Sequence, residues 1–287
     1  MMPFDYQEPA TLDEAAALLR AGDGAAAVLA GGTDLLVQMR ERVRRPAQVV
    51  NIKKILGLDG LTFDAREGLA IGALATTRAL ETSETVRRHY AGLHAATVHF
   101  ASIQVRHRAT VVGNVCRASP SADTLPPLIA DGATLRLHGT DGVRMVALED
   151  FCSGPGRTRL AAGELVTRID VPPPPPHTGK VYLKHGRRQE MELATVGVAV
   201  TLTLDGTRCR DVRIVLAAVA PTPLRVHAAE ALLRGVPIEP AALAAAAAAA
   251  AAAAQPIGDV RASADYRREM VGVLTRRALE QALEAAR

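Results

Sequence analysis

The chain has very few cysteines. Of its 287 residues only Cys116, Cys152 and Cys209 are cysteine, and they lie far apart and outside any CxxC arrangement. Disulfide frameworks, zinc sites and iron–sulfur clusters require paired or closely spaced cysteines. The sequence therefore predicts none of these groups from this chain alone. It favours a reducing compartment, and we expect a cytoplasmic protein.

Aromatic residues and clustered positive charge are also scarce. Aromatics make up 3% of the residues, and 34 Lys and Arg residues stand against 30 Asp and Glu residues, which leaves a net charge of +4. Thirty of these basic residues are arginines scattered through the sequence. Nucleic-acid-binding proteins need a basic patch and commonly use aromatic stacking platforms. We therefore expect no nucleic-acid partner.

Long apolar segments are absent with one exception. The start of the chain has no positively charged stretch followed by a continuous apolar one, and the single long apolar run, residues 241–254, is nearly pure alanine. Alanine has the highest helix propensity, so this run predicts a helix. We expect neither an export signal nor a membrane span.

Hydrophobic residues make up 48% of the chain, enough for a sizeable core, and the length predicts two domains. The five prolines at 172–176 cannot continue a sheet, so they mark a boundary. We assign residues 1–176 to a first domain, with lobes at about 1–56 and 57–176. Residues 177–287 form the second domain.

The first fifty residues predict a compact β-α-β-like unit. Thr11 and Glu14 form a capping box that opens a helix. Apolar residues then recur at helical spacing after the glycines near residue 31, until Pro46 stops the pattern. The expected elements are the first helix to about residue 22, a strand through 28 and 29, a helix from 35 towards 46, and a buried strand at 47–52.

Periodicity also predicts the remaining elements. Residues 102–123 are polar, contain glycine and show no apolar periodicity, so we interpret them as an ordered loop. The expected strands are 61–64, 69–73, 133–138, 143–148, 164–171, 190–204 and 212–220. The expected helices are two within 76–101, two near 226–234 and 239–254, and a terminal helix from about 261 with an apolar stripe of Val271, Leu274, Ala278, Leu279, Ala282 and Leu283.

The Gly-Gly-Thr corner at 31–33 lies between an expected strand and an expected helix. Glycines at such a corner free backbone N–H groups to converge on an anion, which predicts a phosphate site. The corner lacks the GK[ST] of a P-loop and the third glycine of a dinucleotide-binding fingerprint. A tight turn without a ligand has the same sequence, so both interpretations stay open on this motif alone.

A second segment, "ATVVGNVCRASPSAD" at 109–123, is rich in small polar residues. Two phosphate-compatible loops in one domain favour a long ligand with a pyrophosphate centre and hydroxylated arms, because Asp123 can accept from hydroxyls and Asn114 can both donate and accept. A surface loop without a ligand is the alternative. The candidate polar residues are Thr110, Gly113, Asn114, Ser119, Ser121 and Asp123.

Four segments together resemble a known family. They are "AGGTDLLVQMR", "QVRHRATVVGNVCRASPSADTLPPLIADGATLRL", "KHGRRQEMELATVGVAV" and "DVRASADYRREMVGVLTRRAL". In this order they resemble the FAD-binding medium subunits of molybdenum hydroxylases, the group of carbon monoxide dehydrogenase and xanthine dehydrogenase. The resemblance implies an α+β fold. Its parts are a two-lobed FAD-binding domain of the vanillyl-alcohol-oxidase (PCMH) type and a C-terminal CO dehydrogenase flavoprotein-like domain of a small antiparallel sheet with helices, with the flavin between them.

The resemblance also implies which residues hold FAD. The first corner binds the pyrophosphate through main-chain amides, and the second loop holds the rest of the cofactor. Phe100 lies near the isoalloxazine, and Lys184 contacts the flavin. The complete set carried over is Ala27, Val28, Leu29, Ala30, Gly31, Gly32, Thr33, Asp34, Phe100, Thr110, Gly113, Asn114, Asp123, Val166 and Lys184.

Two positions depart from the family pattern. Val112 stands where the first glycine of T-x-G-G-N is usual, so the approach of backbone to flavin can differ there. His107 stands where many relatives have the asparagine of I-R-N. We interpret this histidine as a structural hydrogen-bonding residue rather than a base.

The implied function is that of an electron relay, since the cofactor carries the redox chemistry. The resemblance implies a 2Fe–2S small subunit as donor, a molybdopterin-binding large subunit that hydroxylates the substrate, an external acceptor, and a dimer of heterotrimers. No catalytic residue and no metal site is then expected on this chain. The alternatives are a stand-alone flavin oxidase and a scaffold subunit without flavin. The substrate (CO, a purine, an N-heterocycle or an aldehyde) and the acceptor (a quinone, NAD or oxygen) stay open.

Overall fold

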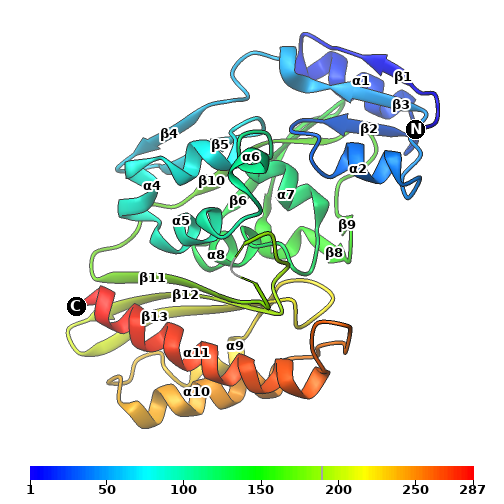
Figure 1. Cartoon of the computed structure of the whole chain (residues 1–287). Coiled ribbons are helices and arrows are strands. Elements are labelled where there is room, and N and C mark those ends of the chain that lie inside the picture. Colours follow the sequence, from blue (N-terminus) through cyan, green and yellow to red (C-terminus); the bar gives the residue numbers. More distant parts are fainter. Residues whose placement is uncertain (189) are drawn as a thin grey trace.

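The structure is a computed structural model that describes residues 1–188 and 190–287. Three main sheets follow one another from the N-terminus to the C-terminus (Figure 1). A small parallel sheet comes first, a five-stranded antiparallel sheet follows, and a four-stranded antiparallel sheet comes last. In Figure 1 the long C-terminal helix lies on the side of the four-stranded sheet that faces away from the five-stranded sheet.

The small parallel sheet has the order β1-β3-β2, and both of its strand pairs are parallel. Thr11 caps the first helix by accepting a hydrogen bond from the Glu14 N–H, and the Glu14 carboxylate accepts one from the Ala10 N–H. The expected helix, strand, helix and strand of the first fifty residues are present, but the second helix ends at Arg40, well before Pro46. The elements are β1 (Asp5–Gln7), α1 (Leu12–Ala21), β2 (Ala26–Leu29), α2 (Leu35–Arg40), β3 (Gln48–Asn51) and the 3₁₀ turn η1 (Ile52–Lys54).

The five-stranded sheet has the order β4-β5-β10-β6-β7 and is antiparallel throughout. Its strands are β4 (Leu61–Asp64), β5 (Gly68–Gly72), β6 (Thr134–Gly139), β7 (Gly142–Ala147) and β10 (Leu165–Val171). The 3₁₀ turn η2 (Leu148–Asp150) and a two-stranded ribbon of β8 (Cys152–Gly154) and β9 (Arg157–Thr158) lie between β7 and β10. All five strands expected from periodicity are confirmed.

The helices of this part differ from expectation. Residues 76–101 contain three helices instead of two, because Ser83 and Tyr90 separate α4 from its neighbours. The expected loop at 102–123 is partly helical, since Ser102 and Thr110 each cap a short helix. The elements are α3 (Thr77–Glu81), α4 (Glu84–His89), α5 (Ala91–Val98), α6 (Ile103–Arg106), α7 (Val111–Arg117) and α8 (Leu125–Ala130).

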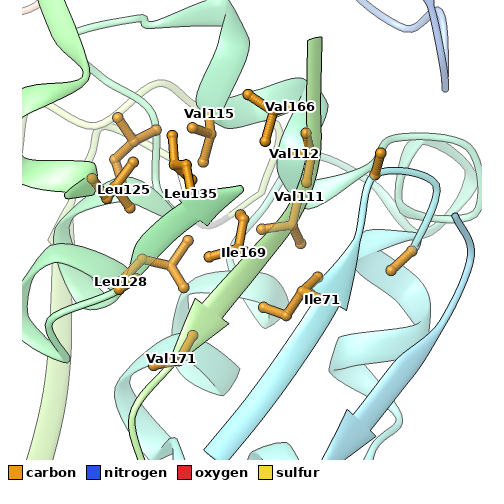
Figure 2. Packing of buried hydrophobic residues seen from close by; sticks show 14 of the residues in the cluster. Ile71, Val111, Val112, Val115, Leu125, Leu128, Leu135, Val166, Ile169 and Val171 are labelled. Atoms are coloured by element: carbon orange, nitrogen blue, oxygen red, sulfur yellow. The ribbon is translucent and has the colours of Figure 1, made fainter. Parts of the chain in front are cut away.

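The core of this part lies between the five-stranded sheet and its helices. Figure 2 shows Val111, Val112 and Val115 of α7 pointing towards strand residues such as Ile169. These three valines occupy one face of a single helical turn, which is why α7 forms in an otherwise polar segment. The labelled cluster consists of Ile71, Val111, Val112, Val115, Leu125, Leu128, Leu135, Val166, Ile169 and Val171.

The four-stranded sheet has the order β11-β12-β13-β14 and is antiparallel. Alternate residues of its strands face opposite sides. Tyr182, Ala199 and Val215 join the core of the five-stranded part, whereas Val198 and Val200 pack with the terminal helices. Both faces are therefore covered, by α5 and α8 on one side and by α11 on the other. The elements are β11 (Thr178–His185), β12 (Val196–Asp205), β13 (Arg208–Ala217), β14 (Leu224–Arg225), α9 (His227–Ala231), α10 (Pro240–Ala253) and α11 (Ala264–Ala286).

The alanine run forms α10, and the stripe expected on the terminal helix is confirmed: Val271, Leu274, Ala278, Leu279 and Ala282 are buried, and Leu283 packs against them. The strand expected from residue 190 begins at Val196, and β11 was not expected at all. Among the described residues, no helix is long and apolar enough to cross a membrane.

Candidate functional site

A cavity of about 530 Å³ lies between the small parallel sheet and the five-stranded sheet. This volume is within the range of small-molecule sites in proteins. Its wall comes from β2 and the corner before α2, from α7, and from the segment that leads into β10. Eleven of the residues implied by the family resemblance line it: Val28, Ala30, Gly31, Gly32, Thr33, Asp34, Phe100, Thr110, Gly113, Asn114 and Val166.

Strand geometry explains why Ala27 and Leu29, the neighbours of Val28 in β2, do not line the cavity. Successive side chains of a strand point to opposite faces. Val28 faces the cavity, whereas Ala27 and Leu29 pack with Leu35 and Met39 of α2 on the other face. Of the three residues that precede the corner, Val28 therefore faces the cavity, and Ala27 and Leu29 face the core.

The corner itself can be built only with glycine. A Cβ on Gly31 would lie 2.1 Å from the backbone oxygen of Arg108, and Gly32 has a left-handed φ of +76°. The first position permits close approach to the segment before α7, and the second turns the chain into α2. Within the described part of the chain, the N–H groups of Gly31, Gly32 and Thr33 donate to no protein acceptor. The cavity wall therefore carries backbone donors for an anion.

The second segment contributes polar groups from α7. The Thr110 hydroxyl accepts a hydrogen bond from the Gly113 N–H at 3.0 Å, which caps the helix. The Asn114 Oδ1 accepts one from the Thr124 hydroxyl at 2.7 Å, which fixes the side-chain amide at the cavity wall. Val112 lies in the same wall beside Val166 and is nearly fully buried (Figure 2). It is thus a packed core residue of α7 as well as a wall residue.

Asp123 and Lys184 do not line the cavity, but the structure brings them together. The Lys184 ammonium lies 2.9 Å from Asp123 Oδ2 and 3.2 Å from the His99 carbonyl oxygen, and the Tyr182 hydroxyl donates to Asp123 Oδ1 at 2.8 Å. Burial raises the pKa of Asp123, and the charge and hydrogen bonds of Lys184 and Tyr182 oppose this effect. His99 precedes Phe100, a wall residue, so this buried cluster adjoins the cavity at the Phe100 side.

Two arginines in the wall were not expected from the sequence. Arg44 lies in the connection after α2, and Arg117 is the last residue of α7. Arg117 Nε is 3.4 Å from Asp34 Oδ1. No local pattern distinguishes these two arginines from the others, because only the fold brings them to one wall.

Two other titratable residues of the wall, Glu164 and Cys116, have shifted pKa values. Hydrogen bonds from Arg144 hold the pKa of Glu164 below its ordinary value. Burial raises the pKa of the Cys116 thiol to about 12, so it stays protonated and unreactive at neutral pH. Among the described residues, no group of three or more His, Cys, Asp or Glu side chains is placed to hold a metal ion.

Comparison with known proteins assigns the family. Residues 2–174 match the model of the FAD binding domain in molybdopterin dehydrogenase, and residues 181–282 match that of the CO dehydrogenase flavoprotein C-terminal domain. The chain belongs to the FAD-binding subunits of the molybdenum hydroxylases. As a member of this family it is a dehydrogenase subunit, and its cofactor is FAD.

Relatives of this FAD-binding subunit align over nearly their whole length. The xanthine dehydrogenase FAD-binding subunit of Escherichia coli O157:H7 is 32% identical, with 98% of this chain and 96% of the relative covered. The carbon monoxide dehydrogenase medium chain of Afipia carboxidovorans is 34% identical, with 99% and 98% covered. A solved carbon monoxide dehydrogenase from Hydrogenophaga pseudoflava is 36% identical, with 99% of each chain covered and a TM-score of 0.95.

The residues present in this FAD-binding subunit fit its cofactor. The cavity has unpaired backbone donors at the glycine corner, positive charge from two arginines and an apolar wall that includes Val28 and Val166. Such a wall suits a long ligand with an anionic centre and a largely apolar ring system. The assignment of individual residues to individual parts of FAD stays a prediction.

Proposed function

We propose that this subunit carries FAD in the cavity between its two N-terminal sheets and works as an electron relay. It receives electrons from a 2Fe–2S small subunit and passes them to an external acceptor, while a molybdopterin-binding large subunit hydroxylates the substrate. The observation that carries this proposal is the cavity itself, whose glycine corner presents the unpaired N–H groups of Gly31, Gly32 and Thr33.

Each part of the wall has a role in this proposal. The amides of Gly31, Gly32 and Thr33 bind the diphosphate, because N–H groups that converge on one point bind anions. Asn114 offers its side-chain amide to the ligand, while Phe100 lies beside the ring system together with the adjoining Asp123 and Lys184 pair. When bound, FAD supplies the redox chemistry, and the chain supplies binding, orientation and electrostatics.

The titratable groups favour a relay over a self-sufficient oxidase. An oxidase needs a group near the flavin that is free to transfer a proton with the substrate. Asp123 and Lys184 pair with each other, Arg144 binds Glu164, and Asp34 lies 3.4 Å from Arg117. The Cys116 thiol stays protonated because burial raises its pKa. The described wall therefore binds and orients a cofactor but offers no free base for substrate chemistry.

The names of the relatives support a wider assembly. The carbon monoxide dehydrogenase relatives are medium chains, which supports partner subunits for this chain. We propose a dimer of heterotrimers as the complete assembly. Other relatives are subunits of nicotinate, glyceraldehyde and caffeine dehydrogenases. We propose that the substrate is chosen by the large subunit and that the complex works in the cytoplasm, in keeping with the three free cysteines.

Purification of the chain without partners tests this proposal. We expect one FAD per chain, reduction of the flavin by dithionite, and no reduction by CO, purines, N-heterocycles or aldehydes. Turnover of any of these substrates by the lone chain would support a flavin oxidase instead. A colourless chain that binds no FAD on titration would support a scaffold.

A further inference from the structure

Two guanidinium groups from distant parts of the sequence meet at the cavity wall. Arg44 follows α2 and Arg117 ends α7, and both line the cavity together with the glycine corner. Gly156 lies against Arg117, since a Cβ at Gly156 would be 3.2 Å from Arg117 Nη1. Arg117 is therefore held between the first turn of α2, through Asp34, and the β8–β9 turn.

The positive charge of this wall is only partly balanced. Asp34 is the one acidic wall residue among those described that pairs with either arginine, at 3.4 Å from Arg117 Nε. Glu164, the other acidic wall residue, is bound by Arg144 at 2.6 and 2.7 Å. The carboxylate of Asp34 thus pairs with Arg117 and leaves Arg44 without an acidic partner among the described residues, so a net positive charge faces the cavity.

Two further features indicate that an anion binds between the guanidinium groups of Arg44 and Arg117. Arg117 Nε is closed off from solvent and donates no hydrogen bond within the described residues. Desolvation by surrounding atoms and the charge of Arg117 lower the pKa of Arg44, so the two side chains repel each other. An anion between them would relieve this repulsion and give Arg117 a hydrogen-bond acceptor.

The backbone donors of the corner lie in the same wall. The N–H groups of Gly31, Gly32 and Thr33 are unpaired among the described residues, and Asp34 follows directly in the sequence. A diphosphate at this wall can therefore meet main-chain donors and guanidinium groups together. A diphosphate carries two negative charges, one for each arginine.

We propose that Arg44 and Arg117 form a clamp for the diphosphate of FAD, beside the glycine corner, and so set the preference for FAD over riboflavin. This inference rests on the proposed binding of FAD in the cavity. Asp34 holds Arg117 in position before the ligand enters. The clamp binds and positions the cofactor, and it takes no part in electron transfer.

Flavin titrations of FAD-free subunit test the clamp. The variants are Arg44→Gln, Arg117→Gln and Arg117→Lys, with Arg45→Gln as the matched control. Arg45 is exposed, lies outside the cavity wall and donates to the Arg42 carbonyl. Folding is checked by circular dichroism. Each titration is run with FAD and with riboflavin at several NaCl concentrations.

We expect each Gln variant to bind FAD about 10- to 100-fold more weakly, the range for a lost hydrogen bond to a charged group. Riboflavin affinity should change less than about twofold, because riboflavin has no phosphate. FAD affinity should depend less on NaCl concentration in these variants. Salt screens the attraction between guanidinium group and diphosphate, and the variants lack one of these attractions. Arg117→Lys should keep most of the salt dependence, and Arg45→Gln should match the unaltered subunit.

Three results would overturn the inference. Unchanged FAD affinity in both Gln variants would remove the arginines from the site. Equal loss of FAD and riboflavin would show a structural role instead of diphosphate recognition. If the unaltered subunit bound riboflavin but not FAD, or neither flavin, the proposed function itself would be wrong and the clamp with it.

Discussion

The ammonium of Lys184 on β11 lies 2.9 Å from the carboxylate of Asp123, which precedes α8. This ion pair joins the four-stranded sheet to the segment that contributes α7 to the cavity wall. From the resemblance, Lys184 was expected to contact the flavin and Asp123 to hold another part of FAD. The structure shows that each is already the partner of the other, and that both are at least nine-tenths buried.

Replacement of Lys184 by Met should destabilise the subunit in a pH-dependent way. Loss of one partner of a buried pair costs about 3–5 kcal/mol of unfolding free energy at neutral pH. Burial raises the pKa of Asp123, and the charge and hydrogen bond of Lys184 lower it. Without Lys184 the effect of burial dominates more strongly, so the pKa of Asp123 rises further. The folded variant then binds a proton that the unfolded chain releases above about pH 4. Its unfolding free energy should therefore fall as pH rises.

Urea unfolding of the FAD-free protein at pH 5 and pH 8 measures this effect. The deficit of Lys184→Met relative to the unaltered chain should be larger at pH 8 than at pH 5. An equal deficit at both pH values would show that lost packing, and not the charge of Asp123, accounts for it.

The glycine corner predicts a sharp contrast between two glycine substitutions. In Gly31→Ala the new methyl group would lie 2.1 Å from the backbone oxygen of Arg108, so the corner must shift away from α7. We expect a loss of about 1–3 kcal/mol in stability from overpacking. FAD affinity should fall at least about tenfold, because the N–H donors move.

Gly60→Ala is the matched control. Its Cβ would meet no atom closer than the Gly57 oxygen at 4.0 Å, so stability should change by less than about 0.5 kcal/mol. Thermal unfolding and FAD titration measure both variants. If Gly31→Ala kept the stability and FAD affinity of Gly60→Ala, the close approach of Gly31 to the Arg108 backbone would not be required for FAD binding.

A second buried ion pair, between Lys180 and Asp131, predicts a loss of stability without a loss of cofactor. The two groups are 2.9 Å apart and nearly inaccessible, and Asp131 also accepts a hydrogen bond from Thr201. Lys180→Met leaves the buried carboxylate unpaired, which should cost about 3–5 kcal/mol. Neither residue lines the cavity, so the FAD affinity of the folded variant should be unchanged.

Arg20→Gln serves as the control for this variant, because the Arg20 and Asp141 pair is exposed and should contribute less than about 1 kcal/mol. Denaturant unfolding compares the two. A similar small loss in both variants would contradict a structural role for the Lys180 pair.

Short-range sequence signals predicted much of the fold. The Thr11 capping box, the strand before Gly31 and the apolar stripe of α11 depend on residues close in sequence, and the structure has them as expected. The segment 102–123 was interpreted as a loop because its two helices are too short to show periodicity. The buried face of α7 is only one turn long.

The composition of the cavity wall was harder to foresee. Strand alternation at Val28 shows that Ala27 and Leu29 must face away from the cavity. The positions of Arg44 and Arg117, in contrast, depend on how α2 and α7 pack. The pairing of Asp123 with Lys184 likewise depends on the four-stranded sheet closing over α5 and α8. Such tertiary relationships leave no periodic pattern in the sequence.

The electron-relay account is tested most directly by anaerobic stopped-flow absorbance of the flavin. The subunit is mixed with CO, purine, N-heterocycle or aldehyde substrates, alone and after reconstitution with its molybdenum and iron–sulfur partners. The account predicts that one of these substrates bleaches the flavin rapidly in the reconstituted complex, and that none does so in the lone subunit. Rapid bleaching in the lone subunit, or a complex whose iron–sulfur centres become reduced while its flavin stays oxidised, would contradict it.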